Sequence, residues 1–174
     1  MHVTNQINDK HSISSNSVSS ITETSNGDIW FATDRGGICK YDSKENNFRT
    51  VSLAEGLPDD TAYKIVEDKN GYLWFGTNSG LVQFDPQNFT IETYSTDNGL
   101  PSNQFNYKSA LASSTGELFF GTLEGLISFF PERLEQNSFI PPVYITHTKH
   151  KNDEASGEFY DKATNTAYLH SKQI

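Results

Sequence analysis

The sequence predicts an all-β fold built from about three repeated, four-stranded antiparallel sheets. One pattern occurs three times along the 174 residues, as NGDIWFATDRGGICKYD, NGYLWFGTNSGLVQFD and TGELFFGTLEGLISFF. The turn glycines of the copies, Gly27, Gly71 and Gly116, lie 44 and then 45 residues apart. Aromatic residues make up 13% of the chain, which favours strands over helices. Four short strands in a period of about 45 residues are typical of a propeller blade, so we predict a β-propeller fragment.

The first half of each copy predicts a β-hairpin. In the second copy, YKIVED and YLWFGT flank Asn70-Gly71, a strong hairpin signal because both central residues must tolerate positive φ. VSSITET, Asn26-Gly27 and IWFAT fit the same scheme in the first copy. A third strand follows a glycine-closed loop (GICKYD, GLVQFD, GLISFF), and a fourth follows a polar turn (FRTVSL, FTIETYS). Residues 1–4 occupy the position of a fourth strand ahead of the first copy, so the chain is expected to begin in mid-blade.

The apolar residues within these strands are consecutive instead of alternating. Leu73, Trp74 and Phe75 follow one another, which suits a sheet covered on both faces by neighbouring blades. Trp30 and Trp74 occupy the same repeat position. Their rings could stack on a sugar, but a shared repeat position favours packing between blades. Function is expected where the copies differ.

Composition excludes several classes of partner. The formal charge of −9, from 13 basic and 22 acidic residues, repels phosphate backbones and anionic lipids, so neither nucleic acid nor a membrane surface is expected as a partner. No apolar run approaches the length of a membrane span, and the first residues lack the apolar core of a secretory signal. The single cysteine, Cys39, excludes an internal disulfide, and we interpret it as a small buried apolar residue.

No residues are predicted to be catalytic, and no metal or cofactor is expected. Asp59 and Asp60 are adjacent, and adjacent carboxylates seldom converge on one glycosidic bond. His147 and His150 would point to opposite faces of a strand, with no further ligand at suitable spacing. The sequence also lacks G-x-S-x-G, H-E-x-x-H and a phosphate-binding glycine loop.

Candidate binding residues lie in the loops that should gather around the propeller axis. If the first strand of each blade is innermost, the connections between blades and the loops after each second strand share one face. These loops are rich in side chains that form directional hydrogen bonds with hydroxyl groups. The candidate ligand-binding residues are Asp34, Arg35, Asp59, Asp60, Asn78, Asn103, Gln104 and Glu124. The alternative is that they are solvated turn residues.

The G-x-L-W-x-G-T-x-x-G-L core of the second copy, preceded by GLPDDTAYKIVEDK, resembles the two-component regulator propeller repeat. This repeat fills the extracytoplasmic sensor region of hybrid two-component histidine kinases in bacteria that digest polysaccharides. The first copy departs from it at Ala32 and Gly36-Gly37, and the third has Phe119 in place of tryptophan. The segment FFPERLEQNSFIPPVYITH resembles the exit into the family's immunoglobulin-like Y_Y_Y domain. The resemblance implies propeller blades over 1–131, then a linker and a truncated, partly disordered immunoglobulin-like tail over 132–174.

The resemblance implies a periplasmic, non-catalytic sensor fragment that recognises oligosaccharides derived from polysaccharides. Two alternatives stay open: a structural or protein-interaction fragment without a small ligand, and a propeller-type polysaccharide lyase or hydrolase. Three blades alone would leave the outer face of each end blade uncovered. We therefore expect a homo-oligomer through propeller edge strands, in which the N-terminal strand of one chain completes the third blade of another.

Overall fold

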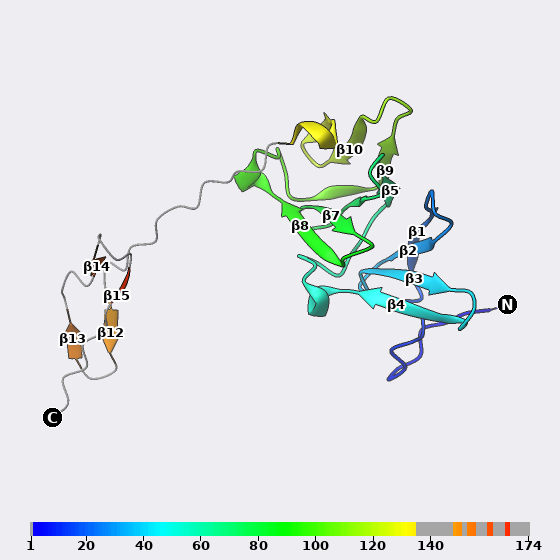
Figure 1. Ribbon diagram of the computed structural model, residues 1–174, viewed down its shortest axis with the longest axis horizontal. Coiled ribbons are helices and arrows are strands. Elements are labelled where there is room, and N and C mark those ends of the chain that lie inside the picture. Colours follow the sequence, from blue (N-terminus) through cyan, green and yellow to red (C-terminus); the bar gives the residue numbers. More distant parts are fainter. Residues whose placement is uncertain (1, 135–147, 151–152, 156–159, 162–165, 168–174) are drawn as a thin grey trace. The chain divides into compact units, whose positions relative to one another are not determined.

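The computed structural model describes residues 2–134, 148–150, 153–155, 160–161 and 166–167 (Figure 1). The chain forms two compact units, Met1–Leu134 and Glu135–Ile174. The described residues contain strands and three short 3₁₀ turns, η1 (Leu53–Glu55), η2 (Thr96–Asn98) and η3 (Pro131–Arg133). The predicted all-β class is therefore confirmed.

The first unit consists of three antiparallel sheets, called blades 1 to 3 (Figure 1). Blade 1 has the order β1 (Val18–Glu23), β2 (Ile29–Thr33), β3 (Ile38–Asp42), β4 (Asn47–Val51). Blade 2 has the order β5 (Val66–Glu67), β6 (Leu73–Gly76), β7 (Leu81–Asp85), β8 (Thr90–Tyr94). Blade 3 contains β9 (Phe105–Ala112), β10 (Leu118–Thr122) and β11 (Gly125–Phe129). Among the described residues blade 3 thus has three strands, one fewer than the four expected of each blade.

The second unit contains two short hairpins among its described residues. One pairs β12 (Thr148–His150) with β13 (Asp153–Ala155), and the other pairs β14 (Tyr160–Asp161) with β15 (Thr166–Ala167). Residues 135–147, which carry most of the predicted entry into a Y_Y_Y domain, and His147 with them, lie outside the described residues. That part of the interpretation stays a prediction.

The chain ahead of β1 is a loop, so the strand expected at residues 1–4 is not formed by the described residues 2–4. The loop is fastened by Asn5, whose backbone N–H donates to Asn16 Oδ1 (2.7 Å) and whose amide donates to the carbonyl of Ile13 (2.7 Å). Ile13 is 5% exposed and packs with Cys39 and Phe48 on blade 1. These contacts hold the segment between Asn5 and Asn16 in a loop against blade 1.

Strand β5 is much shorter than the predicted YKIVED, because the backbone ahead of it bonds to the preceding blade. The Ser19 hydroxyl donates to the carbonyl of Ala62 (2.5 Å), and the Thr22 hydroxyl donates to the carbonyl of Ile65 (2.9 Å). These bonds from β1 satisfy backbone groups that would otherwise need a strand partner. They also hold the innermost strands of blades 1 and 2 side by side, and β1 contacts β9 as well. The first strands of all three blades therefore converge.

The core lies between the blades. Blades 1 and 2 bury Trp30, Ala32, Ile38, Val51, Leu57, Ala62, Ile65, Leu73, Phe75, Val82 and Phe84. Blades 2 and 3 bury Val66, Trp74, Leu81, Phe105, Leu118 and Phe120. Both tryptophans are 0% exposed, which confirms their interpretation as core residues. Cys39 is buried as expected, and its burial raises the pKa of the thiol.

Candidate ligand-binding site

The loop after each second strand is closed in the same way in all three blades. The hydroxyl of the threonine that ends the strand donates to the carbonyl of a glycine across the loop: Thr33 to Gly37 (2.9 Å), Thr77 to Gly80 (2.8 Å) and Thr122 to Gly125 (3.1 Å). The frame of the loop is therefore constant. Its tip differs, with Asp34-Arg35 in blade 1, Asn78-Ser79 in blade 2 and Leu123-Glu124 in blade 3.

The tip of blade 1 lies beside the segment that enters blade 2. The backbone N–H groups of Gly36 and Gly37 both donate to the carbonyl of Asp60, at 2.9 and 2.6 Å. The N–H of Ala62 donates to the carbonyl of Thr33 (3.0 Å). These bonds bring side chains from two blades to one place, as the strand order predicted.

Six side chains from these segments form the site cluster, defined as Asp34, Asp59, Thr61, Tyr63, Asn78 and Ser79. The Tyr63 hydroxyl donates to Asn78 Oδ1 (2.6 Å), and the Asn78 amide donates to Asp59 Oδ1 (3.4 Å). The Ser79 hydroxyl donates to the other Asp59 oxygen (3.5 Å), and the Thr61 hydroxyl donates to Asp34 Oδ1 (3.5 Å). The structure thus groups three of the predicted residues, Asp34, Asp59 and Asn78, with hydroxyl groups that were not predicted.

An aromatic pair adjoins this cluster. The rings of Tyr63 and Tyr107 meet edge to face, with centroids 5.9 Å apart, and Tyr107 is 52% exposed. Tyr107 lies on β9, whose register with β10 slips between Phe120 and Thr122. Lys108, next to it, has φ of 60°, a left-handed conformation that is uncommon outside glycine. Such a bulge redirects side chains, and this one presents an exposed ring beside the site cluster.

Sequence reasoning missed both tyrosines, although the spacing contained a signal. Leu57 and Leu100 are 43 residues apart, whereas Gly71 and Gly116 are 45 apart. Two extra residues must therefore lie between the leucine and the glycine of the third copy. An insertion within a strand predicts a bulge, and Tyr107 lies in that interval.

The surroundings of Tyr63 in the site cluster raise the pKa of its phenol. Burial raises the pKa of Tyr63, and the neighbouring carboxylates of Asp59 and Asp34 raise it further. Tyr63 therefore remains a neutral hydrogen-bond donor and acceptor across the physiological range. The Arg35 guanidinium lies 3.7 Å from the Asp34 carboxylate with its side chain 86% exposed, so this ion pair is weak and leaves Arg35 accessible.

The other predicted residues have different positions. Asp60 Oδ1 accepts from the N–H of Leu53, at the start of η1, and Asn103 Oδ1 accepts from the N–H of Thr96, at the start of η2, both at 2.7 Å. Asp60 and Asn103 thus hold the turns η1 and η2, which are equivalent in the repeat. Gln104 and Glu124 are exposed in blade 3. No hydrogen bond joins either side chain to the site cluster within the part of the chain that the structure describes.

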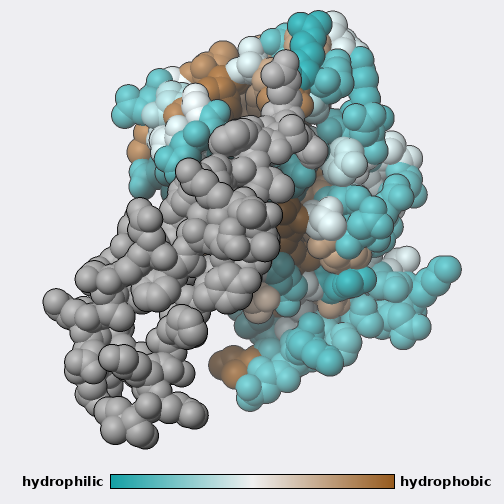
Figure 2. Space-filling view, turned by 60° about the vertical axis from the view of Figure 1, so that its left-hand side comes forward, coloured by the Kyte–Doolittle hydropathy of each residue, from teal (hydrophilic) through white to brown (hydrophobic). Residues whose placement is uncertain are grey.

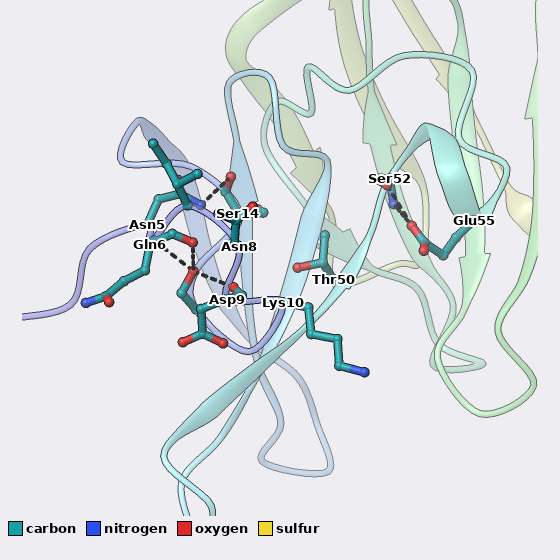
Figure 3. A pocket seen from close by; sticks show the side chains of 11 residues that line it. Asn5, Gln6, Asn8, Asp9, Lys10, Ser14, Thr50, Ser52 and Glu55 are labelled. Carbon is teal, nitrogen blue, oxygen red and sulfur yellow. Dashed lines mark hydrogen bonds between the residues drawn. The ribbon is translucent and has the colours of Figure 1, made fainter.

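Two open grooves of about 570 and 580 Å³ lie away from the site cluster, along the N-terminal loop and β4. Figure 3 shows the first, with Asn5, Gln6 and Asp9 on one side and Thr50, Ser52 and Glu55 on the other. Its polar groups mainly serve their own loops: Ser52 and Glu55, for example, form the capping box of η1. The described residues hold no cluster of three or more potential metal ligands.

Comparison with known families identifies the repeated unit. The family model described as "two component regulator propeller" matches residues 12–35 and 56–79. These two stretches match the two-component regulator propeller repeat. Each matched stretch runs from the segment entering a blade to the tip of the loop after its second strand, so both cover the same part of blades 1 and 2. This confirms the repeat identified from the sequence.

Three solved structures are similar to this chain. PorZ, a surface component of the type-IX secretion system of Porphyromonas gingivalis, is 22% identical over 65% of this chain and 17% of its own, with a TM-score of 0.52. The extracellular domain of a protein assigned as a hybrid two-component system of B. thetaiotaomicron is 22% identical, with a TM-score of 0.49. The match covers 99% of this chain and 28% of that domain. Virginiamycin B lyase of Staphylococcus aureus is 20% identical, with a TM-score of 0.47. The match covers 63% of this chain and 40% of the lyase.

At 22% identity and a TM-score of 0.52, the likeness to PorZ concerns the fold alone. The chain spans between 17% and 40% of the length of these three structures. No curated protein sequence matches it. No helix among its described residues has the length and apolar character needed to cross a membrane.

Proposed function

We propose that this chain is a non-catalytic, extracytoplasmic recognition segment of a two-component sensor, and that its ligand is an oligosaccharide. The repeat family supports the sensor assignment, because regulator propeller repeats are named for two-component regulation. The periplasmic location belongs to the same proposal.

The observation that carries the ligand class is the site cluster beside Tyr107. Asp59 and Asn78 offer a carboxylate and an amide, and Tyr63 offers a neutral phenol, within one connected set of hydrogen bonds. Such groups fix hydroxyl-bearing ligands by directional bonds. The exposed ring of Tyr107 adds an apolar face on which the C–H face of a sugar ring can pack. Both features arise where the copies differ.

The experiment is a thermal-shift screen of the 174-residue chain with neutral and acidic oligosaccharides. A ligand at 100 times its Kd should stabilise the folded state by about 2.7 kcal/mol. Tyr107→Ala and Asn78→Ala should each weaken binding about tenfold or more, whereas Leu53→Ala, an exposed residue of η1, should leave it unchanged. If no oligosaccharide raises the unfolding temperature, or if the two site variants bind as the parent does, the ligand assignment is wrong.

A second function, a protein-interaction segment without a small ligand, is favoured by one specific observation. Blade 3 exposes Leu111 and Leu126 on a sheet face, at 56% and 70%. Single exposed apolar residues are common on protein surfaces, but residues grouped on one sheet face indicate an interaction surface. The occupant of this face is derived next.

A further inference from the structure

Blade 3 has a sheet face that repeats a buried face of blade 2. Val66, Trp74 and Leu81 pack against blade 3 and are at most 6% exposed. The residues 45 positions later are Leu111, Phe119 and Leu126. The strand pairing is equivalent too, since Trp74 lies opposite Val66 in blade 2 and Phe119 lies opposite Leu111 in blade 3. We call Leu111, Phe119 and Leu126 the blade 3 end face.

Blade 1 carries the complementary surface at the other end of the unit. Ile65, Phe75 and Phe84 of blade 2 pack against blade 1 and are at most 1% exposed. The equivalent residues of blade 1 are Ile21, Phe31 and Tyr41, which we call the blade 1 end face. Ile21 is 65% exposed, and Phe31 and Tyr41 are only partly buried. The unit therefore ends in the two halves of one blade–blade interface.

The N-terminal loop covers part of the blade 1 end face, because Phe31 and Tyr41 pack against the cluster that contains Ile13, but it leaves Ile21 65% exposed. Ile13 stands 44 residues ahead of Leu57, which is itself part of the core between blades 1 and 2. Ile13 therefore occupies a position that belongs to a blade–blade interface. On the side shown in Figure 2, the described surface is mostly hydrophilic, with separate apolar patches.

We propose that the occupant of the blade 3 end face is the blade 1 end face of a second copy of this chain. The contact would continue the packing seen between blades 2 and 3, because the same repeat positions meet. It is a head-to-tail contact, in which each copy contributes two different surfaces. It uses sheet faces, so it does not require the N-terminal strand expected from the sequence. The inference is independent of the oligosaccharide proposal.

The test measures the mass of the full chain by sedimentation and light scattering from micromolar to millimolar concentrations. The unmodified chain should associate as its concentration rises. Leu126→Glu and Ile21→Glu should each weaken association at least tenfold, because each places a charge in the contact. Leu53→Glu, a matched change at a 55% exposed leucine outside both end faces, should leave it unchanged. All three sites are exposed, so circular dichroism should show folded protein.

Mixing the two end-face variants tests the head-to-tail geometry. One variant keeps an intact blade 1 end face and the other an intact blade 3 end face, so a mixture should associate although neither variant does alone. Failure of the mixture to associate would overturn the proposal, and association of either variant alone would indicate like-with-like contact and overturn it too. A monomeric unmodified chain would also overturn it.

Discussion

The interface between blades 1 and 2 and the interface between blades 2 and 3 use the same repeat positions but fill them differently. Ala32 lies in the same buried cluster as Ala62 in the first interface. In the second, the equivalent positions are Gly76 and Phe105, and a methyl group on Gly76 would overlap the Cβ and Cγ of the Phe105 ring system. The repeat therefore fixes which positions face each other across an interface. The sizes of the two facing residues differ from one interface to the next.

The polar partners of the two tryptophans differ in the same way. The Trp74 indole N–H donates to Asp68 Oδ2 (2.9 Å), and the other oxygen of this buried carboxylate accepts from two backbone N–H groups. In blade 1 the residue equivalent to Asp68 is Thr24, and the Trp30 indole N–H has no hydrogen-bond partner among the described residues. The two equivalent tryptophan rings are thus equally buried, but among the described residues only the Trp74 indole N–H has a hydrogen-bond partner.

The largest expected effect comes from removing the small residue of the second interface. Gly76→Ala should destabilise the fold by about 3 kcal/mol, because close packing leaves no room for the methyl group beside Phe105. Chemical denaturation measures this free energy of unfolding. In a Phe105→Ala background, which recreates the alanine pair of the first interface, the same change should cost less than about 1 kcal/mol. Equal costs in both backgrounds would contradict the proposed compensation.

The two tryptophans provide a matched pair for the next prediction. Trp74→Phe should cost about 2 kcal/mol more than Trp30→Phe, because only the former leaves a buried carboxylate oxygen without its donor. The third copy already has phenylalanine at this position. Unfolding free energies of both variants, measured at one pH, give the comparison. Equal losses would mean that the Asp68 bond contributes nothing to stability.

The sequence predicted the parts of this architecture that depend on periodicity. Three copies, their hairpins and the grouping of Asp34, Asp59 and Asn78 all follow from repeat spacing and strand order. The shortening of β5 was not predictable, because it depends on hydroxyl groups of the neighbouring blade. The meeting of Tyr63 and Tyr107 requires a backbone conformation at a bulge, and residue pattern alone does not specify that conformation.

An alkaline titration should distinguish the two interfaces further. Burial, followed by the hydrogen bond to Glu92, raises the pKa of Tyr94 to about 12, and its ring stacks on Trp74 with centroids 5.6 Å apart. The unfolded chain would lose this proton near pH 10, so stability is complete below that value and falls as pH rises toward 12. Because Tyr94 is only partly buried, solvent screening should limit the loss to about 1 kcal/mol. Val51 is its equivalent in blade 1 and cannot titrate.

Unfolding free energies measured between pH 8 and pH 12 test this difference. Tyr94→Phe should remove the part of the alkaline loss that Tyr94 causes. Tyr41→Phe serves as the control at a partly buried tyrosine outside the interface between blades 2 and 3. An alkaline loss that persists unchanged in Tyr94→Phe would contradict the assignment.

The smallest expected effect concerns Asp42 and Asp85, equivalent residues at the ends of β3 and β7. Partial burial opposes ionisation of Asp85, but the N–H of Gln87 and the amide of Asn88 outweigh it and hold the pKa of Asp85 below its usual value. The N–H groups of Glu45 and Lys44 lower the pKa of Asp42. Each carboxylate stabilises the folded state above its ordinary pKa, and this contribution is lost as pH falls through the lowered value. Asp85→Asn should therefore flatten the stability profile on its acid side, below about pH 4. A profile as steep as that of the unmodified chain would show that these turn bonds carry no stability.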